Sequence, residues 1–77
     1  MEPIGISVFA EDRPGLMRDV TACVAEANGN IEGLHLLAGV QTEIHLEIVG
    51  DVDKRSLLDE LAEIPQVMRV VLTDSAK

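Results

Sequence analysis

The chain has 77 residues, a single cysteine, a single aromatic residue and a net charge of −8. This length predicts one domain spanning residues 1–77 with a core at 4–73, and Cys23 alone can form neither an intrachain disulfide nor a cysteine-based metal site. The acidic charge and the lack of Trp and Tyr argue against nucleic acid and anionic membrane as partners. No basic segment precedes the first apolar run, so we expect a cytoplasmic protein.

The first half of the chain predicts a strand, a helix and a second strand. Within residues 3–10, Ile4, Ile6, Val8 and Ala10 alternate with Gly5, Ser7 and Phe9, which is the period of a strand. A helical stripe of apolar residues begins at Leu16, Pro14 suits its first turn, and the Asn-Gly pair at 28–29 suits a left-handed helix end. Residues 30–38 predict the second strand.

The second half predicts a strand, a helix and a last strand. Residues 42–49 alternate cleanly between inward apolar and outward polar positions. A second helix can be capped by Asp51 or Asp53 and is expected to end at Pro65, before a strand over 66–73. The expected apolar stripe of this helix consists of Leu57, Leu58, Leu61 and Ile64.

This order of elements predicts an α+β fold, the ferredoxin-like βαββαβ sandwich, with a four-stranded antiparallel sheet and both helices on one face. Right-handed crossovers would place the first and third strands in the middle. The second and fourth strands are then edges, which favour pairing with another copy of the chain.

Other activities that use this topology require residues that the chain has only in part. An acylphosphatase-type enzyme needs a phosphate-binding loop with an arginine, and an asparagine elsewhere. Arg13 and either Asn28 or Asn30 meet part of that requirement, but Pro14 removes one N–H group from the loop. RNA-recognition domains need aromatic residues on the sheet, and copper carriers need a Cys-x-x-Cys loop. We therefore keep the acylphosphatase-type enzyme only as an unfavoured alternative.

The histidines offer a second candidate site, on the open face of the sheet. His35 and His45 could bind a metal together with Glu43 and Glu47, although a solvated polar face is the simpler interpretation. No Ser–His–Asp arrangement can be argued from the sequence, and Cys23 is expected to pack against the core. We predict no metal, no cofactor and no catalytic residue.

The segment Asp12-Arg13-Pro14-Gly15-Leu16 joins the first strand to the first helix. Gly15 lets a ligand approach the backbone, and the free N–H groups at a helix start favour a carboxylate. Asp12 could accept a hydrogen bond from the ammonium group of a small zwitterion. The alternative is that Asp12 only caps the helix, and the residues alone leave both interpretations open.

With these residues the chain resembles the ACT domain family over residues 4–73. The likeness rests on Ile6-x-Val8, on the loop at 12–16, on Glu-Ala-Asn-Gly-Asn-Ile at 26–31 and on Ile-Pro-x-Val-x-x-Val at 64–70. The resemblance implies a non-catalytic regulatory module, attached to or acting on an enzyme, that dimerises and binds a small amino acid between two copies. A purely structural dimerisation module is the alternative.

The resemblance also implies which residues meet the amino acid. By position they are Glu11, Asp12, Arg13, Pro14, Gly15 and Leu16 of one copy, with Asn30 of a second copy opposite. Serine-binding members have a His-x-Asn-x-Pro-Gly loop, and here Ala10 and Asp12 stand at the His and Asn positions. One side-chain donor is therefore absent and a carboxylate replaces an amide, so the identity of the amino acid stays open.

Overall fold

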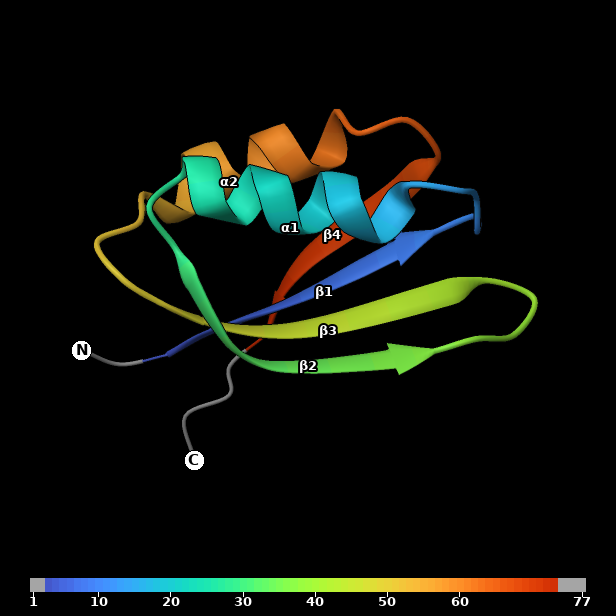
Figure 1. Cartoon of the computed structure of the whole chain (residues 1–77), viewed down its shortest axis with the longest axis horizontal. Coiled ribbons are helices and arrows are strands. Elements are labelled where there is room, and N and C mark those ends of the chain that lie inside the picture. Colours follow the sequence, from blue (N-terminus) through green and yellow to red (C-terminus); the bar gives the residue numbers. More distant parts are fainter. Residues whose placement is uncertain (1–2, 74–77) are drawn as a thin grey trace.

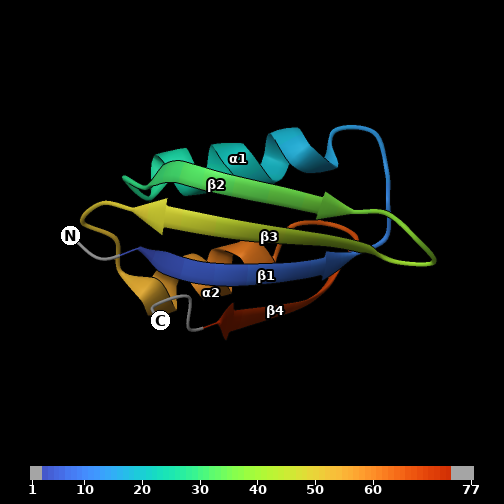
Figure 2. The same ribbon diagram turned by 90° about the horizontal axis from the view of Figure 1, so that it is seen from below.

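The structure, a computed structural model, describes residues 3–73 and has six regular elements in the predicted order. They are β1 (Ile4–Ala10), α1 (Leu16–Glu26), β2 (Asn30–Leu37), β3 (Thr42–Val49), α2 (Lys54–Ala62) and β4 (Val67–Thr73). The strands form one antiparallel sheet in the order β2-β3-β1-β4. Both helices lie on one face of it (Figure 1), and the other face is open (Figure 2). The predicted ferredoxin-like fold is confirmed, with β1 and β3 central and β2 and β4 at the edges.

The core lies between the sheet and the two helices, because alternate residues of β1 and β3 face the helices. Every second residue of β3, from Thr42 to Ile48, is buried, while Glu43 and His45 on the open face are partly exposed. The fully or almost fully buried apolar side chains are Ile6, Val8, Ala10, Leu16, Val20, Val24, Ile44, Leu46, Ile48, Leu57 and Leu61. The predicted helical stripes and inward strand positions therefore meet in a single core.

The end of α1 is closed by two backbone hydrogen bonds of the Schellman type. The N–H of Gly29 donates to Val24 O at 2.9 Å, and the N–H of Asn28 donates to Ala25 O at 3.1 Å. Asn28 is the left-handed residue, with φ 68°, as the sequence predicts for this pair. Gly29 has a different role, since a Cβ there would lie 2.8 Å from the side chains of Val24 and Ile48.

Two predictions about helix ends are wrong. Pro14 does not lie in the first turn of α1, which begins at Leu16, because Gly15 before it is left-handed (φ 84°, ψ 0°). Ile64 does not belong to α2, which begins after Asp53 and ends at Ala62. The residue before a proline is disfavoured in helical conformation, so the chain leaves the helix before Ile64, whose side chain still packs against the core.

Candidate functional site

The loop between β1 and α1 contains a type II β-turn over residues 13–16. The N–H of Leu16 donates to Arg13 O at 3.2 Å, which closes the turn. Pro14 occupies the second position, where its fixed φ fits, and Gly15 occupies the third, where φ must be positive. Glycine is therefore required by the backbone itself as well as by any ligand that approaches it.

The helix cap that was the alternative role for Asp12 is not formed. Gly15 is the residue that precedes α1, and no side chain makes a capping hydrogen bond there. The N–H of Leu16 donates to the turn, whereas the N–H groups of Met17 and Arg18 have no acceptor within residues 3–73. Free N–H groups at the positive end of a helix favour an anionic group.

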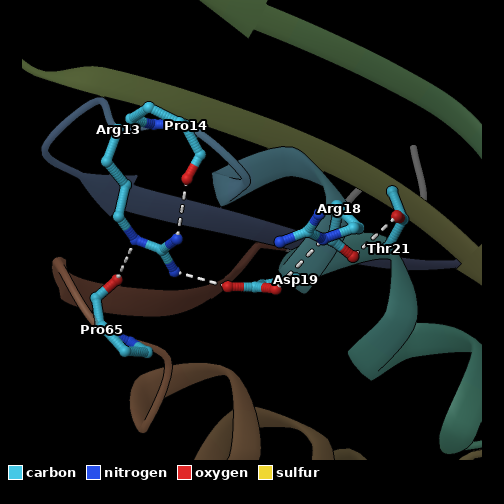
Figure 3. Close-up of polar contacts among 6 residues, drawn as sticks. All are labelled: Arg13, Pro14, Arg18, Asp19, Thr21 and Pro65. Carbon is cyan, nitrogen blue, oxygen red and sulfur yellow. Dashed lines mark hydrogen bonds and ion pairs between the residues drawn. The ribbon is translucent and has the colours of Figure 1, made fainter.

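Several contacts attach the loop to α1 and to the connection between α2 and β4. Arg13 Nε donates to Pro65 O at 3.1 Å, and Arg13 Nη2 pairs with Asp19 Oδ2 at 2.6 Å (Figure 3). The N–H of Glu11 donates to Gln66 O at 3.0 Å, and Gln66 Nε2 donates to Glu11 Oε1 at 3.3 Å. Arg13 and Glu11 thus make internal contacts that position the loop.

A cavity of about 430 Å³, partly open to solvent, lies where this loop meets the start of α1 and the β2–β3 hairpin. Four of the predicted site residues line it, namely Asp12, Arg13, Gly15 and Leu16. Sequence reasoning did not find the other lining residues, which are Met17, Arg18, Leu36, Ala38 and Thr42. The hairpin reaches this place because Thr42 pairs with Ala10 at the end of β1.

The remaining predicted residues do not line the cavity. Glu11 and Pro14 belong to the same loop. The Glu11 carboxylate accepts from Gln66 Nε2, and the carbonyl oxygen of Pro14 accepts from Arg13 Nη1. Asn30 pairs with Val49 at the opposite end of β2, so within one chain it is remote from the loop.

The cavity is mainly apolar and has opposite charges near its mouth. Leu16, Met17, Leu36 and Ala38 supply apolar surface. The Arg18 side chain is 82% exposed, and its one ion pair among the described residues is a long one, 3.8 Å, with Asp19. Asp12 is exposed and makes no side-chain hydrogen bond within the part of the chain that the structure describes. An apolar space beside free N–H groups, an exposed cation and an exposed carboxylate suits a zwitterion with an apolar side chain.

A family model described as the AHAS small subunit-like ACT domain matches residues 6–69, which is most of the chain. The chain belongs to the ACT domain family. Members of this family are regulatory, non-catalytic domains that typically bind ligands, and the family predicted from the loop and helix-end motifs is confirmed. No curated protein matched in a search of the sequence.

Solved structures of ACT domains have the same fold. The ACT domain of GTP pyrophosphokinase from Chlorobium tepidum in the crystal has a TM-score of 0.79 at 23% identity, over 94% of this chain and 97% of that one. Its solution structure has a TM-score of 0.76 at 26% identity, and the match covers 96% of this chain and 88% of that one. A homoserine dehydrogenase from Thiobacillus denitrificans matches with a TM-score of 0.77 at 19% identity, over 92% of this chain and 16% of the enzyme.

The open face of this ACT domain holds a polar chain of three residues that the sequence analysis did not find. Ser7 Oγ lies 2.7 Å from His45 Nδ1, and His45 Nε2 lies 3.3 Å from Glu43 Oε1. This resembles a Ser–His–acid arrangement, but Ser7 is only 2% exposed, so its hydroxyl is not accessible to a substrate. The hydrogen bond to His45 instead satisfies a buried hydroxyl.

The histidines do not form a larger ligand cluster within one ACT domain. His35 and His45 are direct cross-strand partners on the open face. Within residues 3–73, however, no group of three or more His, Cys, Asp or Glu residues is arranged to hold a metal ion.

Cys23 packs against the core from α1, as expected. Burial raises the pKa of its thiol, and the carboxylates of Glu60 and Glu26 raise it further.

Neither helix of the described chain is long and apolar enough to cross a membrane.

Proposed function

We propose that this ACT domain binds a small amino acid with an apolar side chain in the cavity beside Gly15, and that a second copy of the chain closes the site. The observation that supports this most strongly is the cavity itself. Its volume of about 430 Å³ accommodates a free amino acid. Its apolar walls would receive the side chain, so charged amino acids are expected to bind poorly.

The polar groups at the loop define an orientation for the bound amino acid. Its carboxylate would accept hydrogen bonds from the N–H groups of Met17 and Arg18 at the start of α1. The Arg18 guanidinium is free to add a charged contact. Its ammonium group would lie toward the Asp12 carboxylate, which is exposed at the mouth of the cavity. Arg13 is excluded from this contact set, because its own guanidinium already has three acceptors.

The edge strand β2 offers the surface for a second copy. Leu34 and Leu36 lie on the helix side of the sheet but beyond the cover of α1, and Leu36 is 51% exposed. Two β2 strands paired antiparallel about a two-fold axis would place the start of one beside the end of the other. Asn30 of the second copy would then approach Leu36 and Ala38 at the cavity, which is the position that the family resemblance implies for it.

The regulated partner is proposed to be an enzyme, either covalently attached or separate. Regulatory ACT domains occur in enzymes such as homoserine dehydrogenase. Binding transmits information only if the amino acid has a higher affinity for one arrangement of the subunits than for another. The cytoplasmic setting predicted from the sequence remains part of this proposal.

Isothermal titration calorimetry with single amino acids tests the proposal. We expect L-valine, L-leucine, L-isoleucine or L-methionine to bind with millimolar or better affinity, and L-aspartate and L-lysine to give no heat of binding. Asn30→Ala should weaken binding about tenfold, the effect of one hydrogen bond to a charged group. Gln41→Ala, in the exposed hairpin outside the cavity, is the matched control and should bind as the wild type does.

The alternative of a purely structural dimerisation module makes a different prediction for the same experiment. The exposed leucines of β2 favour self-association whether or not a ligand is present. That function predicts a stable dimer whose melting temperature is unchanged by every amino acid. A dimer without any heat of binding at millimolar concentrations would replace our proposal with this one.

The acylphosphatase-type enzyme is not favoured by the geometry. Its arginine would have to face a phosphate group, whereas all three nitrogens of the Arg13 guanidinium point to oxygens of the chain (Figure 3).

A further inference from the structure

Arg13 joins three parts of the chain that are separate in sequence. Its Nη1 donates to Pro14 O at 3.1 Å within the loop, its Nη2 pairs with Asp19 on α1, and its Nε donates to Pro65 O before β4 (Figure 3). The pair with Asp19 is short, 2.6 Å, and the Arg13 side chain is only 21% exposed. Because planar guanidinium groups form directional bonds, these contacts together fix the loop relative to both segments.

The segment to which Arg13 is bound has an unusual backbone. Gln66 has φ 77°, a left-handed conformation that residues other than glycine rarely adopt. Such conformations persist where the surrounding contacts determine them. Here Gln66 O accepts from the N–H of Glu11, Pro65 O accepts from Arg13, and the N–H of Val67 donates to Ile64 O at 3.1 Å.

The edge strand β4 begins directly after this turn. Val67 pairs with Ala10, and the register of the β1–β4 ladder shifts between Phe9 and Ala10. Met68 follows Val67 and is 50% exposed on the free edge of the sheet. The conformation of the Pro65–Gln66 turn therefore determines where an exposed edge strand starts.

We propose that Arg13 is a positioning residue that couples occupation of the cavity to the start of β4. This inference rests on the proposed amino-acid site. A ligand bound to the N–H groups of Met17 and Arg18 would order the start of α1, which carries Asp19, the ion-pair partner of Arg13. The tighter Arg13 contacts would then hold the Pro65–Gln66 turn in one conformation. The start of the exposed edge strand β4 would be fixed in the ligand-bound protein, where a partner could contact it. Arg13 itself does not contact the amino acid.

Amide hydrogen exchange followed by NMR tests this coupling. The reporters are the N–H groups of Glu11 and Val67, and the chemical shift of the Met17 amide monitors binding. The probes are L-valine, L-leucine, L-isoleucine and L-methionine, each added alone. The variants are Arg13→Lys and Arg13→Gln. Arg55→Gln is the charge-matched control, because Arg55 is exposed on α2 and its side chain makes no hydrogen bond or ion pair within residues 3–73.

We expect a probe that shifts the Met17 amide to slow the exchange of Val67 about tenfold in the wild type and in Arg55→Gln. In Arg13→Gln the probe should still shift the Met17 amide but leave the exchange of Val67 unchanged, with Arg13→Lys in between. A purely structural role would alter exchange equally with and without the probe. Binding that leaves Val67 unaffected in the wild type, or that still slows it in Arg13→Gln, would overturn the inference.

If no probe shifts the Met17 amide, the proposed function fails, and a ligand-free experiment decides the role of Arg13. The Gln66→Gly variant should have a higher melting temperature than the wild type, because glycine adopts the left-handed conformation without strain. If Arg13 holds Gln66 in that conformation, the rise should be clearly smaller in the Arg13→Gln background. Equal rises in both backgrounds would show that Arg13 does not position the turn.

Discussion

At the scale of single residues, the conformation of Gly15 shapes both the turn before α1 and the proposed site. Its positive φ closes the type II turn over residues 13–16, and among residues 3–73 the N–H groups of Met17 and Arg18 find no acceptor. A Cβ at Gly15 would lie 2.9 Å from Arg18 Nη2, which belongs to a flexible side chain and can move away. Backbone strain is therefore the dominant cost of any substitution.

Replacement of Gly15 is expected to destabilise the fold as well as to impair binding. Gly15→Ala should lower the free energy of unfolding by about 1–2 kcal/mol, the usual cost of a left-handed residue with a Cβ. Gly15→Asn, the matched variant, should cost less because asparagine tolerates this conformation. Urea denaturation measures both variants, and an Ala variant as stable as the wild type would contradict this assignment of the turn.

The Cys23 thiol provides a prediction for pH dependence. Because burial and then Glu60 and Glu26 raise its pKa in the folded protein, the thiolate is scarcer there than in the unfolded chain. The raised pKa contributes stability below the pKa of the unfolded thiol, and this contribution is lost as the pH rises through the folded value. Alkylation by iodoacetamide at mildly alkaline pH should therefore be several-fold slower than in urea-unfolded protein.

Glu60→Gln removes one of the two carboxylates that raise this pKa and should accelerate alkylation of the folded protein. Glu47→Gln, on the open face of the sheet, is the control and should leave the rate unchanged. Equal alkylation rates in the folded and unfolded protein would show that the pKa of Cys23 is not raised.

At the scale of elements, the two edge strands differ in their relation to the cavity. Leu34 on β2 and Leu72 on β4 occupy similar positions, both on the helix side of the sheet and 39% and 46% exposed. Only β2 ends at the cavity, through Leu36 and Ala38. If the second copy closes the site, β2 is the strand that must pair with it.

Leu34→Lys should therefore weaken self-association at least about tenfold, because it places a charge in the proposed interface. Leu72→Lys is the matched control and should leave the oligomeric state unchanged. Sedimentation analysis measures both, and neither variant should unfold, because both side chains are already exposed. Dissociation by Leu72→Lys but not by Leu34→Lys would assign the interface to β4 instead.

The order of elements and the central strands were predictable, because strand and helix periods are distinct in this sequence. The ends of the helices were less so. A φ near −65° at Pro14 fits both the first turn of a helix and the second position of a type II turn, and only the left-handed Gly15 distinguishes them. Likewise, apolar Ile64 continues the helical stripe of α2 but packs on the core from outside the helix.

The lining of the cavity was predictable only where it is local in sequence. Asp12 and Gly15 follow from one loop motif, whereas Leu36 and Thr42 are brought to the loop by the register of the sheet. That register depends on which strands are neighbours and cannot be read from a single motif. The hydrogen bond from Arg13 to Pro65 was also not predicted, because the two residues are 52 positions apart in the sequence.

At the scale of the whole molecule, a chain of 77 residues with a net charge of −8 has a small core and a cavity that is partly open to solvent. Small domains often gain stability by association, and this one has an exposed apolar edge next to a half-open cavity. A second copy that closes the cavity would also cover the exposed apolar side chains of the edge strand, so one contact would complete the proposed site and bury the edge. Ligand binding and dimerisation should then be linked, each strengthening the other.

The most direct test of the central claim is an NMR titration of the isotopically labelled chain with the four apolar amino acids. The account predicts that at least one of them shifts the amides of Gly15, Met17 and Arg18 together with those of Leu36 and Ala38, from opposite sides of one cavity. Asn30 should shift with them, although it lies at the far end of β2 in its own chain. Amide shifts confined to other surfaces, or none at millimolar concentrations, would contradict the account.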